Sequence, residues 1–255
     1  MDRKKIIIGN WKMNPASSGE AERLFTSVAK LISASRGAEI VVCPPAIYLP
    51  KLKKISKKIV LGVQDASADN SVGAFTGDIS AEMLGNMGAK YVILGHSERR
   101  SRGETDEVVN RKIKAALSAG LRPILCVGEL ERDENHEYFK VVQSQVAECL
   151  SGISKNLISK VVVAYEPVWA ISSTPARRDA TPENLREMAI FIRKIISNIW
   201  SSTIRLPRVI YGGSVNEKDA EEFISAQVDG LLVGRASLDP KKFAAIVKIC
   251  EALNK

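Results

Sequence analysis

Three side chains that could together move a proton each follow a short apolar run of this sequence. Lys12, His96 and Glu166 stand two or three residues after such runs. A carboxylate shielded from water is a stronger base, and Val168 and Trp169 supply apolar surface beside Glu166. The pattern predicts that Glu166 removes a proton from a carbon next to a carbonyl group. Taken alone, Glu166 could equally be a helix cap or a salt-bridge partner.

His96 and Lys12 would support this reaction by stabilising negative charge on oxygen. His96 opens the sequence HSER, which is typical of a helix N-terminus, and the positive end of a helix disfavours imidazolium. A neutral imidazole there can donate a hydrogen bond to a carbonyl and later to an enediolate. Lys12 can hold a phosphate or an enolate, and Asn10 can hydrogen-bond the substrate or fix Lys12. A solvated surface lysine is the alternative for Lys12.

Two glycine-containing turns predict a phosphate site. Gly212-Gly213-Ser214 and Gly234-Arg235-Ala236 follow the last two apolar runs of the chain. Glycine lets backbone N–H groups turn toward an anion, and a following helix N-terminus adds a favourable field. Either sequence alone could be only a tight turn, but the pair favours phosphate binding.

Short apolar runs with helical patterns between them predict the scaffold for these residues. The runs are apolar throughout rather than alternating, as in parallel strands that are covered on both faces. They comprise residues 6–9, 40–43, 59–63, 91–94, 123–127, 160–164, 208–211 and 230–233. The amphipathic segments cover residues 19–35, 106–120, 136–150, 181–200, 217–227 and 240–253.

This alternation predicts an α/β fold, a single closed (β/α)8 barrel over residues 1–255, with its chemistry at the carboxyl ends of the strands. A doubly wound open sheet is the alternative, but no GxGxxG sequence follows the first run. Thr181-Pro182-Glu183 predicts the start of a helix, with Thr181 as the N-cap.

Composition excludes several other classes of protein. No stretch approaches the ~18 apolar residues of a membrane span, so no membrane partner is expected. The N-terminal residues lack the apolar core of a signal peptide. Four cysteines (Cys43, Cys126, Cys149 and Cys250) show no CxxC spacing, which predicts buried, reduced thiols and a cytoplasmic protein.

The net charge of +8 would fit a nucleic-acid partner or an anionic substrate. The basic residues are dispersed, however, and no nucleic-acid motif or aromatic stacking platform accompanies them. We therefore expect no nucleic-acid partner. The densest run, KLKKISKK at residues 51–58, predicts an amphipathic helix with a solvated basic face.

Seven motifs resemble those of the triosephosphate isomerase family. They are NWKMN (10–14), GAFTGDIS (73–80), GHSERR (95–100), CVGE (126–129), AYEPVWAI (164–171), YGGSV (211–215) and LLVGRASL (231–238), and they occur in the family's order. The resemblance implies a TIM barrel that interconverts dihydroxyacetone phosphate and D-glyceraldehyde 3-phosphate through an enediolate, a reaction of glycolysis and gluconeogenesis. It implies neither a metal ion nor an organic cofactor.

The resemblance also implies roles for individual residues. Glu166 matches the proton-shuttling base, His96 the neutral electrophile, Lys12 the electrostatic residue and Asn10 its neighbour. Glu98 matches a glutamate that supports the lysine, for which ion pairing is the alternative. The N–H groups that bind phosphate in the family fall on Ser172, Ser214, Gly234 and Arg235. The family's hydrophobic clamp falls on Ile171 and Leu232.

The family is usually homodimeric, which implies contact through the loop from Val72 to Ser80, with Val72, Phe75 and Thr76 as candidate contacts. Two departures from the family pattern stand out. The predicted lid, Ser172 to Ala180, lacks the usual Gly-Thr-Gly and is longer, and Arg235 replaces a common second glycine. Another phosphate-binding barrel enzyme and a pseudoenzyme that only binds ligand remain the alternatives.

Overall fold

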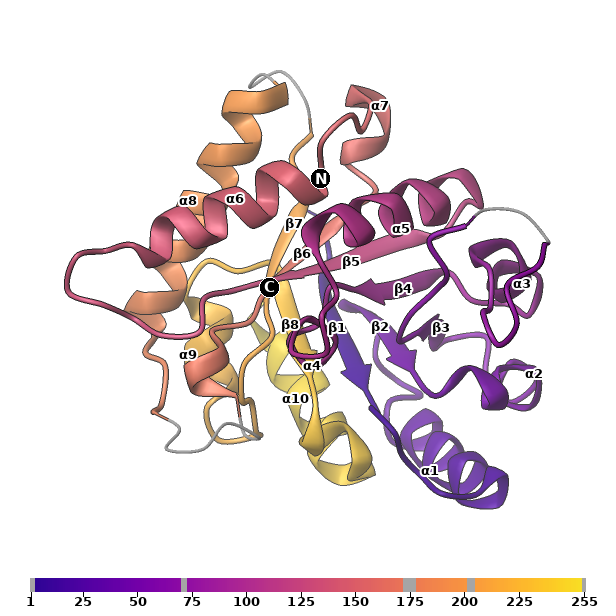
Figure 1. Cartoon of the computed structure of the whole chain (residues 1–255). Helices are drawn as coiled ribbons and strands as arrows, with labels where there is room; N and C mark the ends of the chain where they lie inside the picture. The colour runs from indigo at the N-terminus through magenta and orange to yellow at the C-terminus, as the bar shows by residue number, and fades with distance from the viewer. Residues whose placement is uncertain (1–2, 70–72, 172–177, 201–204, 254–255) are drawn as a thin grey trace.

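Eight parallel strands form a closed barrel in the computed structural model, which describes residues 3–69, 73–171, 178–200 and 205–253. Each strand pairs with its sequence neighbours, and β8 pairs with β1 (Figure 1). The predicted (β/α)8 barrel is therefore confirmed. The strands are β1 (Lys5–Asn10), β2 (Ala38–Cys43), β3 (Val60–Val63), β4 (Tyr91–Leu94), β5 (Arg122–Val127), β6 (Val162–Tyr165), β7 (Arg208–Tyr211) and β8 (Gly230–Val233).

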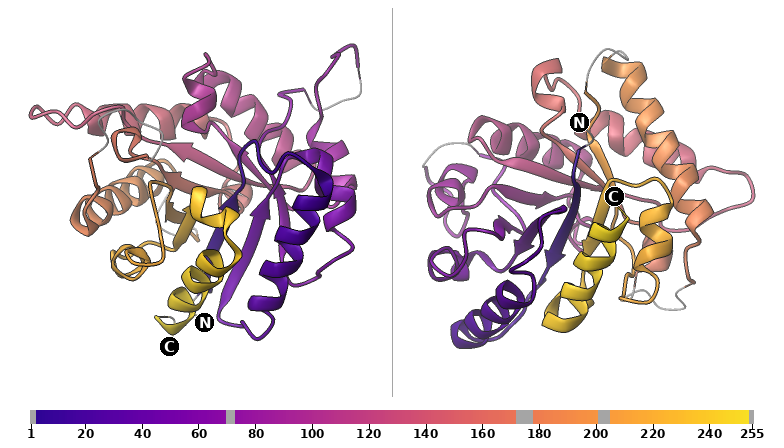
Figure 2. Two further views of the ribbon diagram at one scale, coloured as in Figure 1. Left: turned by 90° about the horizontal axis from the view of Figure 1, so that it is seen from below. Right: turned by 180° about the vertical axis from the view of Figure 1, so that it is seen from behind.

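Helices surround the barrel, and α10 packs beside α1 to join the two ends of the chain (Figure 2). Thr181 caps α8 as predicted, since its hydroxyl accepts the N–H of Asn184 at 3.3 Å. The helices are α1 (Ser18–Leu31), α2 (Leu49–Leu52), α3 (Ala81–Asn86), α4 (Ser97–Arg100), α5 (Asp106–Ser118), α6 (Tyr138–Cys149), α7 (Lys155–Ile158), α8 (Pro182–Trp200), α9 (Ala220–Ser225) and α10 (Pro240–Ala252). Short 3-10 helices are η1 (Ala46–Tyr48), η2 (Val168–Ala170) and η3 (Arg235–Leu238).

Alternate strand residues fill two separate cores, as the two-residue period of a strand requires. In β1, Ile6 and Ile8 face the barrel interior while Ile7 packs against the outer helices. In β6, Val162 and Ala164 face the interior. Continuing this alternation by one step points Asn10 of β1 and Glu166 after β6 into the barrel mouth. The core packing thus positions these two residues.

The basic run at residues 51–58 does not form the predicted amphipathic helix. Helix α2 ends at Leu52, and the chain then turns through Lys53 to Ile55. The Ser56 hydroxyl accepts the N–H of Lys58 at 3.1 Å, which offers the backbone an alternative to helical pairing. Leu52 is also the last fully buried side chain before Ile59, so the core supports no further helical turn.

All four cysteines lie within the described residues, where each is buried and none forms a disulfide. Their predicted burial is confirmed. No helix among the described residues is long and apolar enough to span a membrane.

Candidate active site

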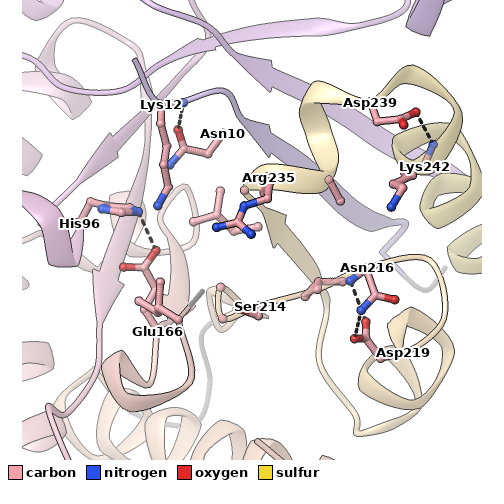
Figure 3. Close-up of a pocket in the computed structure, with 17 residues that line it drawn as sticks. Asn10, Lys12, His96, Glu166, Ser214, Asn216, Asp219, Arg235, Asp239 and Lys242 are labelled. Carbon is pink, nitrogen blue, oxygen red and sulfur yellow. Dashed lines mark hydrogen bonds and ion pairs between the residues drawn. The ribbon is translucent and has the colours of Figure 1, made fainter. Parts of the chain in front are cut away.

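A cavity of about 380 Å³ opens at the carboxyl ends of the strands (Figure 3). Most of the predicted site residues line it, although Glu98 does not and Ser172 lies outside the described residues. The predicted residues in the lining are Asn10, Lys12, His96, Glu166, Ile171, Ser214, Leu232, Gly234 and Arg235. Segments distant in sequence thus converge on one cavity, as the strand-end pattern predicts.

Glu166 directly follows β6, and only 2% of its surface is exposed. Its Oε2 accepts the N–H of Ser97 at 3.2 Å, and its Oε1 lies 3.4 Å from His96 Nε2. Two glycines make room for it. A Cβ at Gly128 would lie 1.9 Å from the Glu166 carbonyl oxygen, and one at Gly212 would lie 2.7 Å from Glu166 Cγ. Because both positions are glycine, the Glu166 carboxylate has space to be buried there.

His96 is the N-cap of helix α4, as the HSER sequence predicts. Its Nδ1 accepts the N–H of Glu98 at 3.2 Å. In a neutral ring this leaves the proton on Nε2, which faces the Glu166 carboxylate. The ring can therefore donate from Nε2 into the cavity.

Lys12 is held in place by its backbone and by an ion pair. Its φ of 52° is in the left-handed region, and the Asn10 Oδ1 accepts its N–H at 3.0 Å. The Lys12 Nζ lies 2.5 Å from Glu98 Oε1. Partial burial alone would raise the pKa of Glu98, but the hydrogen bond and positive charge of Lys12 outweigh it and lower that pKa. The ion pair that was the alternative interpretation of Glu98 is therefore present.

The turn between β8 and η3 presents backbone donors to the cavity. The N–H groups of Gly234 and Arg235 have no acceptor within the described part of the chain. Ser237 fixes the turn, because its hydroxyl donates to the Gly234 carbonyl at 2.7 Å. Arg235 begins η3 and is absent from the residues with positive φ, so a side chain fits there without backbone strain. The turn can therefore offer both N–H groups to an anion.

The apolar wall of the cavity includes Ile171 and Leu232, which are 7% and 2% exposed. The predicted lid falls mostly on residues 172–177, outside the described residues. The chain returns beside its starting point, since the N–H of Arg178 donates to the Trp169 carbonyl at 3.1 Å. This hydrogen bond joins residues on either side of 172–177.

Sequence reasoning assigned no role to two groups that fix the site. Ser97 binds Glu166 through its backbone N–H, which no side-chain pattern reveals. Glu129 is buried, and its Oε1 accepts hydrogen bonds from Trp169 Nε1 and from the Tyr165 hydroxyl, both at 2.8 Å. Its position just after β5 was the available signal. Four further polar residues line the far end of the cavity: Asn216, Asp219, Asp239 and Lys242 (Figure 3).

Comparison with known proteins agrees with this geometry. The family model described as triosephosphate isomerase matches residues 5–250. Triosephosphate isomerase of Aquifex aeolicus is 42% identical over 250 residues, covering 96% of this chain and 98% of the relative. That of Dehalococcoides mccartyi is 44% identical over 252 residues, covering 96% and 97%. A crystal structure of triosephosphate isomerase from Bartonella henselae superposes with a TM-score of 0.83 at 35% identity, covering 97% of this chain and 99% of its own. The chain therefore belongs to the triosephosphate isomerase family.

Proposed function

We propose that this chain interconverts dihydroxyacetone phosphate and D-glyceraldehyde 3-phosphate, a step of glycolysis, with Glu166 as the base. The activity is that of the family to which the chain belongs. The observation that carries the residue assignment is the meeting of Lys12, His96 and Glu166 on one cavity beside the N–H groups of Gly234 and Arg235. These groups match the two ends of a triose phosphate, a carbonyl group and a phosphate.

In this mechanism the phosphoryl group binds at the turns after β7 and β8. The N–H groups of Gly234 and Arg235 donate to its oxygens, together with Ser214, and Ser172 is a further proposed donor. This anchoring sets the carbonyl end of the substrate between Glu166 and His96. Glu166 then removes a proton from one carbon and returns it to the neighbouring carbon, while a second proton passes from the hydroxyl oxygen to the former carbonyl oxygen.

Negative charge forms on the carbonyl oxygen when the proton leaves. His96 donates from Nε2 to this oxygen, and the Lys12 ammonium lies beside the same cavity. Asn10 holds Lys12 through its backbone N–H, and Glu98 holds its Nζ. Ile171 and Leu232 supply the apolar wall that keeps water from Glu166. Burial of the base favours transfer of its charge to the substrate oxygen.

The test is turnover of dihydroxyacetone phosphate by purified protein, measured by coupled oxidation of the glyceraldehyde 3-phosphate formed. Glu166→Gln should reduce kcat by at least about a thousandfold, because the base provides the only proton route in this proposal. The variant should still bind 2-phosphoglycolate, which calorimetry measures directly. Glu98→Gln is the comparison, with a smaller loss, since it removes only the partner of Lys12.

The two alternatives make different predictions in the same assays. A pseudoenzyme would bind 2-phosphoglycolate without turnover by the wild-type protein. A different phosphate-binding barrel enzyme would turn over another sugar phosphate faster than a triose phosphate. Either result would overturn the proposal.

We also propose a homodimer that forms through the loop from Val72 to Ser80. Val72 lies outside the described residues, but Phe75 and Thr76 are exposed. Loops and helices that follow β1, β2 and β3 expose apolar side chains on the same rim: Met13 (93% exposed), Ile47 (75%), Phe75 (45%), Met83 (43%) and Ile79 (39%). Burying these side chains against a second copy would stabilise the pair.

Light scattering tests the dimer. The wild-type protein should have twice the 27.8 kDa mass of one chain. Thr76→Arg places a charge in the proposed contact and should shift the mass toward one chain. A single-chain mass for the wild-type protein at micromolar concentration would contradict the dimer.

We further propose that residues 1–255 form one domain that works in the cytoplasm. The closed barrel runs from β1 to β8, and the family model spans residues 5–250. The four cysteines are free thiols, as is usual for a reducing compartment. Limited proteolysis that released two stable fragments would argue against a single domain.

A further inference from the structure

The side chain of Arg235, and not only its backbone N–H group, borders the cavity. It extends from the start of η3 toward the end of the cavity that holds Lys12, His96 and Glu166 (Figure 3). A Cβ on the preceding residue, Gly234, would lie 3.8 Å from Lys12 Cε, which places this turn directly beside the lysine. Two cationic side chains therefore border the same space.

The Arg235 guanidinium has no counter-ion among the residues that the structure describes. Within the described residues it makes neither an ion pair nor a hydrogen bond to any acceptor. Lys12, by contrast, is paired with Glu98 at 2.5 Å, and Lys242 lies 3.6 Å from Glu217 Oε1. Of the cations that line the cavity, Arg235 is thus the one whose charge no described carboxylate offsets.

The carboxylates of the cavity are engaged elsewhere. Asp239 caps α10 and accepts the N–H groups of Lys241 and Lys242 at 2.8 and 3.1 Å. Asp219 accepts the backbone and side-chain N–H groups of Asn216 at 2.8 and 2.6 Å. Each therefore already has hydrogen-bond partners on its own segment.

Glu166 is likewise engaged, since its oxygens lie near the Ser97 N–H and the His96 ring. The three described carboxylates that line the cavity thus already have partners, and none of them is paired with Arg235.

We infer that the Arg235 guanidinium binds the phosphoryl group of the substrate directly, in addition to the backbone N–H groups of its own turn. This inference rests on the proposed function, because it assumes that the turn after β8 holds the phosphoryl group. A guanidinium presents several N–H donors in a planar fork that matches two phosphate oxygens at once. One residue would then supply the phosphate site with both a backbone donor and a full positive charge.

Three substitutions separate the charge of this side chain from its size. Arg235→Met keeps an unbranched chain without charge, Arg235→Lys keeps the charge without the fork, and Arg235→Gly removes the side chain. Affinity for 2-phosphoglycolate and for inorganic phosphate is measured by calorimetry at low salt. Arg235→Met should weaken both by about tenfold, which is about 1.4 kcal/mol. Arg235→Lys should lose less, because a point charge still attracts the dianion but cannot bind it in two places.

Added guanidinium ion provides a readout that a structural role would not move. In Arg235→Gly, millimolar guanidinium chloride should restore part of the lost kcat/KM for dihydroxyacetone phosphate, while equal sodium chloride should not. The wild-type protein should gain nothing from guanidinium. Circular dichroism and thermal unfolding of each variant confirm that the barrel is folded, which is expected since Arg235 is exposed.

The outcomes distinguish this inference from the proposed function. Binding of 2-phosphoglycolate by Arg235→Met within twofold of the wild-type affinity would overturn the role of the guanidinium, even if the protein is a fully active isomerase. A wild-type protein that binds phosphate but does not isomerise triose phosphates would overturn the proposed function. In that case the tenfold loss of phosphate affinity in Arg235→Met would still support the guanidinium as an anion ligand.

Discussion

The absence of a side chain at position 212 decides where Glu166 can lie. A Cβ there would come within 2.7 Å of Glu166 Cγ and 3.3 Å of its Oε1. Contacts below 3 Å require a shift, and the Glu166 side chain is buried, so it has little space into which to move. Proton transfer depends on alignment to within a fraction of an ångström.

We therefore predict that Gly212→Ala lowers kcat for dihydroxyacetone phosphate by about ten- to a hundredfold, because it displaces the carboxylate while leaving its chemistry intact. Steady-state kinetics at saturating substrate measures the loss. Unchanged kcat, with Glu166 unmoved in a crystal structure of the variant, would contradict the prediction.

Gly85→Ala is the matched control, because it makes the same chemical change far from the cavity. A Cβ at Gly85 would find its nearest neighbours at 3.7 Å, an ordinary contact distance. Gly85 lies within helix α3, so alanine should stabilise the fold by roughly 0.5–1 kcal/mol without affecting kcat. A loss of kcat in Gly212→Ala but not in Gly85→Ala would show that the loss comes from displacement of Glu166 and not from the replacement of a glycine in general.

At the scale of elements, the strands were the most predictable part of the chain. Parallel strands buried on both faces need apolar runs, and the predicted runs at residues 91–94, 208–211 and 230–233 coincide with β4, β7 and β8. Polar residues at the carboxyl end of an apolar run lie at the barrel mouth, where this fold places its chemistry. This is why Asn10 and Glu166 could be picked from the sequence as site residues.

Helix boundaries and backbone contacts were less predictable, because they depend on distant partners. The basic run at 51–58 has helical spacing, but its helix ends at Leu52, where burial against the core ends. The pattern near His136 predicts a helix from residue 136, yet α6 begins at Tyr138 after Asp133 accepts the N–H groups of Glu137 and Tyr138. The hydrogen bond from Ser97 to Glu166 joins two strand ends that no local pattern links.

Four strands are joined at the opposite end of the barrel by a charged cluster around Glu39. Glu39 of β2 accepts a hydrogen bond from the Tyr91 hydroxyl of β4 and lies 2.7 Å from Arg208 Nη1 of β7. Arg122 of β5 lies 3.4 Å from the same carboxylate. Burial would raise the pKa of Glu39, but these hydrogen bonds and the arginine charges lower it overall. The cluster therefore favours the folded state whenever Glu39 is ionised.

Glu39→Gln should lower the free energy of unfolding by about 1–3 kcal/mol at pH 7, because it leaves Arg208 buried without its charge partner. A carboxylate whose pKa is lower in the folded state stabilises the fold above its unfolded pKa of about 4.3. That contribution is lost as the pH falls through the still lower pKa of the folded state. Urea unfolding of both proteins should thus differ most at pH 5–7 and converge below about pH 4.

Glu134→Gln removes an exposed glutamate and serves as the control. Its unfolding free energy should stay within about 0.5 kcal/mol of the wild-type value at every pH. A difference for Glu39→Gln that persisted unchanged at pH 3 would show that the cluster acts through packing rather than through charge.

At the scale of the whole molecule, a net charge of +8 surrounds a cavity that receives a dianionic substrate. A dispersed positive charge creates a long-range potential that attracts anions, and Lys12 and Arg235 extend it into the cavity. Dissolved salt screens such a potential over about 10 Å at 0.1 M ionic strength. The encounter with substrate should therefore depend on salt even where the bound geometry does not.

We predict that kcat/KM for D-glyceraldehyde 3-phosphate falls by roughly threefold to tenfold between 10 and 300 mM ionic strength, because screening slows the approach of the dianion. The salt should consist of ions that bind phosphate sites weakly, such as sodium chloride, and viscosity should be held constant. D-Glyceraldehyde, which carries no phosphoryl charge, is the control substrate, and its kcat/KM should change less than twofold. Equal salt dependence for the two substrates would show that salt acts on the protein itself rather than by screening its attraction for the substrate charge. In Arg235→Met the slope for the phosphorylated substrate should become shallower, since one of the cations nearest the bound phosphate is gone.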